Sequence, residues 1–75
     1  MTNERSTLVV DARGMRCPWP ALRLARAMRE SAEVLLIADD PQAQREVAAL
    51  AGENGWQLAD EVAVDGEGRW RVRRG

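Results

Sequence analysis

The sequence predicts a two-layer α/β sandwich, with two helices packed on one face of a four-stranded mixed sheet. Three observations predict this fold class. Short aliphatic or alternating segments typical of strands occur near both ends of the chain and in its middle. Two longer segments repeat apolar residues at helical spacing, and each follows a strand. The predicted order is β-α-β-α-β-β, and 75 residues form a single domain over the whole chain, 1–75.

The N-terminal part of the chain should hold one strand and one loop. Residues 7–10 are β-branched or aliphatic, a composition typical of strands. Residues 1–6 lack that pattern, and we expect them to form a flexible N-terminus. Residues 11–16 are predicted to form a loop with Gly14 at its turn, and this loop leads into Cys17.

A first helix is predicted from Pro18 to Ser31, because proline is favoured in a first helical turn, where its missing N–H group has no intrahelical partner. Cys17 then lies at or next to the N-cap of this helix. The apolar stripe is expected at residues spaced by three, with two more beside them. These residues are Leu22, Ala25 and Met28, with Ala21 and Leu24.

A second strand and a second helix follow. Residues 33–38 are nearly all aliphatic, which predicts a strand buried on both faces. Asp40 is expected to be the N-cap of the next helix, with Pro41 as its first residue. Asn54 and Gly55 should end that helix with left-handed backbone. The apolar stripe of this helix comprises Ala43, Val47, Leu50 and Ala51.

Two more strands complete the predicted sheet. Apolar residues of one parity predict the third strand, and they are Trp56, Leu58, Val62 and Val64. A hairpin turn is expected over residues 65–68. In the closing strand, Trp70 and Val72 alternate with arginines, which predicts one buried and one charged face.

The composition excludes several classes of function. The net charge is −1, so the chain has no overall basic character that would draw it to nucleic acid. All 11 basic residues are arginine, which excludes a Schiff-base lysine, and the chain has no histidine to act as general base. A single cysteine cannot form an internal disulfide and fits a reducing compartment. No secretory signal or membrane-length apolar run is present, so we expect a cytoplasmic protein that does not bind membranes.

The stretch GMRCPWP places the thiol of Cys17 in a constrained setting. A helix N-terminus stabilises a thiolate through its unpaired N–H groups and positive dipole end. Arg16 is adjacent and Arg13 could approach, so we expect the pKa of Cys17 to lie below that of a free thiol. Pro18 and Pro20 restrict the backbone and should fix the direction of the sulfur. A buried, unreactive cysteine is the alternative.

The other residue types narrow the chemistry of such a thiol. A cysteine hydrolase needs a base beside the thiol, normally histidine, and a dithiol oxidoreductase needs a second cysteine. A metal site needs several ligands, so we expect no bound metal. What remains is one thiol that accepts a group and passes it on. Persulfide carriage needs only that, because a partner protein supplies the remaining catalytic groups.

Two motifs give the chain a family resemblance. The stretch DARGMRCPWP before an amphipathic helix resembles the CPxP signature of TusA-like (SirA-like) sulfur carriers. The DDP stretch after the second strand resembles that family's next landmark, and the predicted element order is similar to its fold. The resemblance covers roughly residues 7–74. Where many members have Asp-Ile-Pro early in the second helix, this chain has EVA at 46–48.

The resemblance implies that Cys17 carries sulfur as a persulfide and that no cofactor is needed. Gly14, Arg16, Pro18 and Pro20 belong to the matching motif and would present the thiolate or stabilise it. Such proteins act with partner enzymes. They receive sulfur from a cysteine desulfurase or a rhodanese-like donor. They pass it to other relay proteins for tRNA thiolation, molybdenum-cofactor supply or sulfur oxidation.

Several residues are candidates for partner docking. On the first helix, the row Arg23, Arg26 and Arg29 either docks an acidic partner or RNA, or is an ordinary solvated face. Arg13 and Trp19 flank the thiol, and Trp19 is either a contact anchor or a lid over the core. A second row fits a charged strand face that resists aggregation, and it comprises Arg69, Arg71, Arg73 and Arg74.

Two other functions remain as alternatives. A non-catalytic binding or regulatory module would use the arginine-rich faces for RNA or a protein partner, and Cys17→Ser would then leave binding intact. A structural subunit would depend on a partner for stability, so its melting temperature would depend on concentration.

Overall fold

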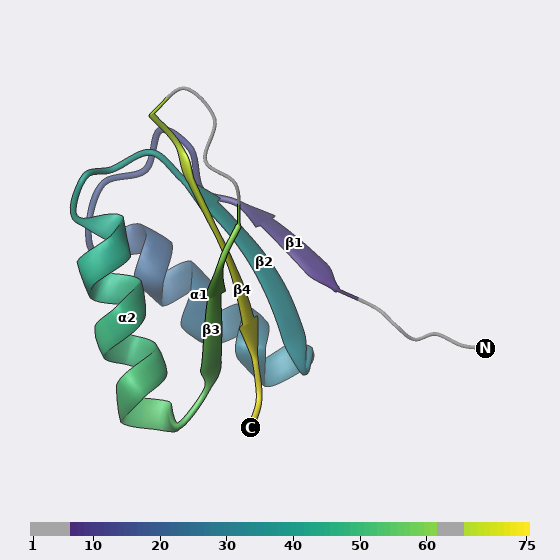
Figure 1. The fold of residues 1–75 in the computed structure, drawn as a ribbon. Coiled ribbons are helices and arrows are strands. Elements are labelled where there is room, and N and C mark those ends of the chain that lie inside the picture. Colours follow the sequence, from purple (N-terminus) through teal and green to yellow (C-terminus); the bar gives the residue numbers. More distant parts are fainter. Residues whose placement is uncertain (1–6, 62–65) are drawn as a thin grey trace.

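Two helices cover one face of a four-stranded sheet, as predicted (Figure 1). The computed structural model describes residues 7–61 and 66–75, and its elements follow the predicted order. They are β1 (Leu8–Asp11), α1 (Trp19–Glu30), β2 (Glu33–Ala38), α2 (Ala43–Asn54), β3 (Gln57–Asp60) and β4 (Gly68–Arg73). The order across the sheet is β1-β2-β4-β3. Strands β1 and β2 are parallel and the other neighbours are antiparallel, so the predicted mixed sheet is confirmed.

Some predictions fall outside the described residues. These are the flexible N-terminus at 1–6, the strand residues Val62 and Val64, and Asp65 of the hairpin turn. Among the residues that are described, no helix is both long enough and apolar enough to cross a membrane.

The core lies between the sheet and the helices, and the register of β2 and β4 builds its centre. Leu36 pairs with Trp70, and Ala38 pairs with Gly68. Leu36, Ala38 and Trp70 are all buried, because alternate residues of a strand point to the same face. A Cβ at Gly68 would collide with the indole ring of Trp70. This position therefore requires glycine for space rather than for backbone freedom.

The buried face of α1 differs from the predicted stripe. Leu24 is fully buried, whereas Leu22 is 51% exposed, so the assignment of Leu22 to the core was wrong. Leu22 lies about 200° around the helix from Leu24, and only one side of α1 faces the sheet. Both possible stripes have helical spacing, so the periodicity alone could not choose between them. The buried residues are Pro20, Ala21, Leu24, Ala27 and Met28.

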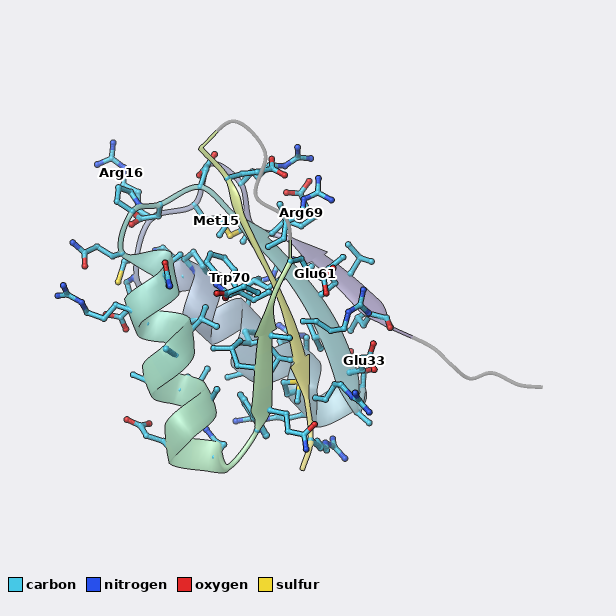
Figure 2. All side chains as sticks on the ribbon, in the orientation of Figure 1. Met15, Arg16, Glu33, Glu61, Arg69 and Trp70 are labelled. Carbon is cyan, nitrogen blue, oxygen red and sulfur yellow. The ribbon has the colours of Figure 1, made fainter. Side chains whose placement is uncertain are left out.

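The helix-free face of the sheet is covered by ion pairs. Strand β2 was predicted to be buried on both faces, which is wrong for Glu33 and Leu35, because both are half-buried. Arg71 of β4 lies 2.7 Å from Glu33 and 3.1 Å from Glu61. Figure 2 shows Glu33 and Glu61 on the side of the sheet away from α2. No second layer covers this face in the described residues, so charged side chains shield it instead.

The other arginines of the C-terminal row are also engaged. Arg69 lies 2.9 Å from Glu67, and Arg73 lies 3.5 Å from Glu33. The guanidinium of Arg74 donates a hydrogen bond to the carbonyl oxygen of Met28. These contacts favour the charged strand face over an open basic surface for RNA.

Helix α2 begins two residues later than predicted. Ala43 is its first residue and Gln42 its N-cap, so the assignment of Asp40 as N-cap and Pro41 as first residue was wrong. The Asp40 carboxylate accepts the N–H of Gln42 at 2.7 Å, and its carbonyl accepts the N–H of Ala43 at 2.9 Å. An Asx turn therefore precedes the helix. The end is as predicted, at Gly55 with φ 70°.

Candidate functional site

The loop that carries Cys17 is held by the loop that follows β2. Because β1 and β2 are parallel, their C-terminal ends share one edge of the sheet, and the two loops run side by side (Figure 1). The N–H of Gly14 donates to Asp39 Oδ1 at 3.0 Å, and the N–H of Cys17 donates to Asp40 Oδ2 at 3.0 Å. The sequence predicted only a capping role for Asp40. Both aspartates in fact fix the backbone around the thiol.

Cys17 is half-buried and lies directly before the N-cap of α1. Pro18 is the N-cap residue, and the peptide bond between Cys17 and Pro18 is cis. Neither Pro18 nor Pro20 has an N–H group, and the N–H of Trp19 donates to the carbonyl of Arg16 at 2.9 Å. The first turn therefore offers the sulfur few of the N–H groups that make an open helix end attractive to an anion.

The pKa of the Cys17 thiol is raised, opposite to the predicted direction. Desolvation by partial burial is the largest cause, followed by a hydrogen bond with Glu46, the charge of Glu46 and the charge of Asp40. Each of these favours the neutral thiol over the thiolate. The predicted lowering by the helix N-terminus and Arg16 was wrong, because neither Arg16 nor Arg13 is among the groups that shift this pKa.

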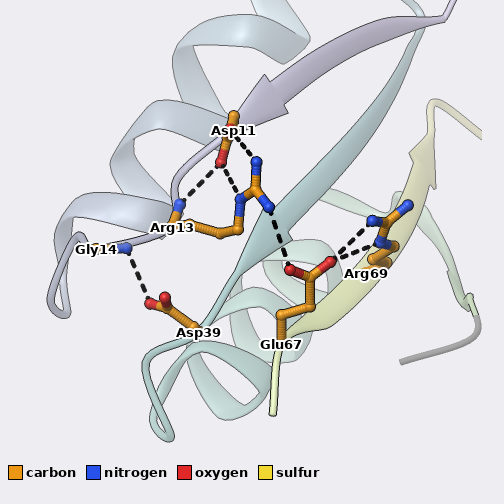
Figure 3. Close-up of polar contacts among 6 residues, drawn as sticks. All are labelled: Asp11, Arg13, Gly14, Asp39, Glu67 and Arg69. Carbon is orange, nitrogen blue, oxygen red and sulfur yellow. Dashed lines mark hydrogen bonds and ion pairs between the residues drawn. The ribbon is translucent and has the colours of Figure 1, made fainter. Parts of the chain in front are cut away.

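Arg13 is held by carboxylates instead. Its guanidinium donates to both carboxylate oxygens of Asp11, at 2.9 and 2.7 Å, and lies 3.5 Å from Glu67 (Figure 3). Glu67 in turn pairs with Arg69 (Figure 3). The hydrogen bond from the Arg13 side chain is the main cause that lowers the pKa of Asp11 to about 2. Arg13 therefore links the loop to β4 and does not serve the thiol.

Arg16 points outward from the loop (Figure 2). Its charge acts on Asp40: the pKa of Asp40 is lowered by N–H bonds from Gln42 and Cys17 and then by the charge of Arg16. The charge of Arg16 thus stabilises the ionised carboxylate of Asp40, which anchors Cys17, rather than a thiolate on Cys17.

Glu46 is a site residue that the sequence motifs did not identify. It lies in the first turn of α2, is half-buried, and is among the groups that raise the pKa of the Cys17 thiol. The one signal for it is its place early in the second helix, where many members of the resembled family have aspartate.

Two large apolar side chains beside the thiol are exposed. Trp19 is 59% exposed and Leu22 is 51% exposed. They are three residues apart and therefore share one face of α1. Trp19 is not a lid over the core, which leaves its interpretation as a contact anchor. Exposed apolar patches of this kind mark interaction surfaces.

The arginines of α1 share the exposed side of the helix with Trp19 and Leu22, because Arg26 lies four residues after Leu22 and Arg23 four residues after Trp19. Arg23, Arg26 and Arg29 are all exposed. Arg23 and Arg26 line a surface depression together with Leu8 and Val9 of β1. None of the three is among the groups that shift the pKa of Cys17, so a role for this row in docking stays a prediction.

Together, these residues form a site with one thiol, one carboxylate, Glu46, that raises the pKa of the thiol, and two aspartates that anchor its loop. In residues 7–61 and 66–75, no cluster of three or more His, Cys, Asp or Glu could hold a metal ion. The arrangement suits a thiol that reacts as a nucleophile and exchanges its proton with a neighbouring carboxylate.

Comparison with known proteins identifies the family. The model of the family described as sulfurtransferase TusA matches residues 8–74. A putative sulfur carrier protein of Archaeoglobus fulgidus is 37% identical over 68 residues, which cover 85% of this chain and 88% of that protein. The crystal structure of a SirA-like protein from Desulfitobacterium hafniense matches with a TM-score of 0.80. That match covers 91% of this chain and 97% of the other, at 24% identity, and shows a shared fold. The chain belongs to the TusA sulfurtransferase family.

Proposed function

We propose that the chain is a sulfur carrier that holds sulfur as a persulfide on Cys17 and passes it to a partner protein. The observation that supports this most directly is the single half-buried thiol on a loop anchored by Asp39 and Asp40, in a chain of the TusA family. Persulfide carriage requires one nucleophilic sulfur on the carrier, and the partners supply the other catalytic groups.

Loading is an exchange between a thiol and a persulfide. The Cys17 thiolate attacks the terminal sulfur of a donor's cysteine persulfide. A new S–S bond forms on Cys17, the donor's S–S bond breaks, and the donor cysteine leaves as a thiolate. Delivery is the same reaction with an acceptor thiolate attacking the terminal sulfur on Cys17. Neither step consumes an oxidant or a reductant.

The raised pKa of Cys17 keeps the thiol of the free carrier protonated and weakly reactive. The proton must leave before loading, because the thiolate is the nucleophile. The charge of Glu46 acts on the thiol, and we assign to this carboxylate the role of proton acceptor as the sulfur reacts. On delivery, the proton returns to the departing Cys17 sulfur.

We assign the donor to the cysteine desulfurases or rhodanese-like proteins and the acceptor to a downstream relay protein. The candidate pathways are tRNA thiolation, molybdenum-cofactor supply and sulfur oxidation. Family membership supports a donor and an acceptor as such. The ion-paired C-terminal row gives the alternative of RNA binding no comparable support.

Incubation with a cysteine desulfurase, cysteine and pyridoxal phosphate tests the proposal. The protein should gain one sulfur, about 32 Da, on Cys17, as read by mass spectrometry of the intact chain and of its peptides. Cys17→Ser should gain nothing. A wild-type chain that stays unmodified by several desulfurases and rhodaneses would refute the assignment.

A further inference from the structure

A groove of about 200 Å³ runs between α1 and α2. Apolar side chains of both helices line it, among them Pro18, Leu22 and Leu50. Two carboxylates, Glu46 and Glu53, also line it. The groove is thus an apolar surface with acidic groups on the α2 side.

The groove opens beside the thiol. Pro18 follows Cys17 directly, and Glu46, which also lines the groove, is among the groups that raise the pKa of the thiol. The exposed side chain of Leu22 belongs to the groove, and Trp19 lies one helical turn before it on the same face. The exposed apolar patch is therefore continuous with the groove, and both lie next to the reacting sulfur.

The charge of the groove selects its occupant. Both ionisable groups that line it are acidic, and no basic residue of the described chain takes part in the lining. A negatively charged apolar surface favours a partner with the opposite charge and repels an acidic one. A nucleic acid strand is excluded on the same ground, because its phosphates would face Glu46 and Glu53.

We propose that this groove docks a segment of the partner protein in which an apolar side chain is flanked by arginine or lysine; the proposal rests on the sulfur-carrier function above and names the chemistry of its partner. The apolar side chain would pack against Leu22 and Leu50. The basic group would pair with Glu46 and Glu53. The segment that fits is therefore both apolar and basic.

Docking of this kind would also change the reactivity of Cys17. The charge of Glu46 raises the pKa of the thiol, so a cation placed on Glu46 would offset that charge and lower the pKa. The carrier would then form its thiolate when a partner is bound. Unproductive reactions of the free carrier would be suppressed.

Peptide binding tests the groove without relying on sulfur transfer. The isotopically labelled carrier is titrated with the capped peptide Gly-Arg-Leu-Arg-Gly and with the acidic control Gly-Glu-Leu-Glu-Gly, and amide chemical shifts are recorded by NMR. The basic peptide should shift the amides of Leu22, Ala25, Ala49 and Leu50, which belong to the two helices lining the groove. The acidic peptide should leave them unchanged.

Two charge reversals sharpen the test. Glu53→Arg should weaken binding of the basic peptide by roughly tenfold or more, because it reverses a charge in the groove. The matched control Glu30→Arg, on the exposed end of α1 and outside the groove, should bind as the wild type does. Equal shifts with both peptides, or equal binding by Glu53→Arg, would overturn the proposal.

Other outcomes separate the groove from the carrier function. Groove shifts that appear in the free protein as its concentration rises would identify a second copy as the occupant and also overturn the proposal. Persulfide formation on Cys17 without peptide binding would refute the groove alone. Peptide binding by a chain that never gains sulfur would refute the carrier function and leave the groove standing.

Discussion

Around Cys17, burial and negative charge act in the same direction on the sulfur. Partial burial removes water from a thiolate, and Glu46 and Asp40 repel its charge. Asp40 has a second role, because it also accepts the N–H of Cys17 and so holds the loop in place. The residue that orients the thiol therefore also disfavours its ionisation, which suits a carrier whose reactivity depends on a partner.

Replacing Glu46 tests this balance. Glu46→Gln should lower the pKa of Cys17 relative to the wild type, because the amide removes the negative charge and is a weaker acceptor for the thiol proton. The rate of alkylation by iodoacetamide against pH would report the midpoint. Glu53→Gln, which lines the same groove but does not shift this pKa, is the matched control. Identical midpoints for Glu46→Gln and the wild type would contradict the assignment.

The reactive residue of the site could be predicted from the sequence, but the residues that surround its thiol could not. Cys17 stands out as the only cysteine and lies between an arginine and a proline. Its contacts with Glu46 and Asp40 join segments far apart in the chain, so local spacing could not show them. Arg13 was expected near the thiol, but its guanidinium pairs with the carboxylates of Asp11 and Glu67 instead.

The elements that border the site each present more than one surface. Helix α1 buries one side against the sheet and exposes Trp19 and Leu22 on its outer side, and Arg23 and Arg26 border a depression beside β1. Arg23 and Arg26 line the depression beside β1, whereas Glu46 and Glu53 line the groove between α1 and α2, so α1 borders two surfaces of different charge. A carrier that meets a donor and an acceptor can use such surfaces for different partners.

Replacing Arg23, Arg26 and Arg29 together with glutamine tests the arginine row. Sulfur transfer to or from an acidic partner should slow, and the penalty should shrink at high salt, because exposed charges steer encounters that salt screens. Folding should change little, since exposed substitutions usually cost within about 0.5 kcal/mol each. Transfer kinetics at low and high ionic strength provide the readout. Equal rates at low salt would show the row to be an ordinary solvated face.

Two glycines form a matched pair for packing. Gly68→Ala should destabilise the protein by about 1–3 kcal/mol, because the new methyl group collides with the buried indole of Trp70. Gly52→Ala in α2 meets no atom within 4 Å and should stabilise it by about 0.5–1 kcal/mol through helix propensity. Urea unfolding of both variants measures the difference. A neutral Gly68→Ala would show that Trp70 shifts freely.

The elements themselves were predictable to different degrees. Their order and type followed from alternation in the strands and helical spacing in the helices, and Gly55 marked the end of α2. The buried face of α1 could not be predicted, because Leu22 and Leu24 fit equally spaced apolar stripes. Only packing against the sheet decides which of the two is buried. The start of α2 was missed because Asp40 bonds backward to the Cys17 loop as well as forward to Gln42.

Across the whole molecule, one face of the sheet is covered by helices and the other by a lattice of ion pairs. Asp11 with Arg13 and Glu33 with Arg71 belong to this lattice. The pKa of Asp11 is lowered to about 2, mainly by Arg13, and that of Glu33 is lowered by Thr7 and then Arg71. The fold therefore depends on ionised carboxylates on this face.

Acid should consequently destabilise the protein. A carboxyl whose pKa is lower in the folded state stabilises the fold above its unfolded pKa, and this contribution is lost as pH falls toward the folded pKa. For Asp11, the loss runs from its ordinary value of 3.8 down to about 2. Urea midpoints at neutral pH and at about pH 3 measure it. Asp11→Asn should lose less stability on acidification, and equal stability of the wild type at both pH values would contradict the prediction.

A sulfur carrier must take up a sulfur atom on Cys17 and release it again. The most direct measurement loads the chain with radiolabelled cysteine and a desulfurase, removes the donor, and adds cyanide, which attacks the terminal sulfur of a persulfide and leaves as thiocyanate. We expect about one labelled sulfur per chain, full release of that label as thiocyanate, and a Cys17 restored to its original mass. A chain that takes up no label, that holds label resistant to cyanide, or that loads equally well as Cys17→Ser would contradict it.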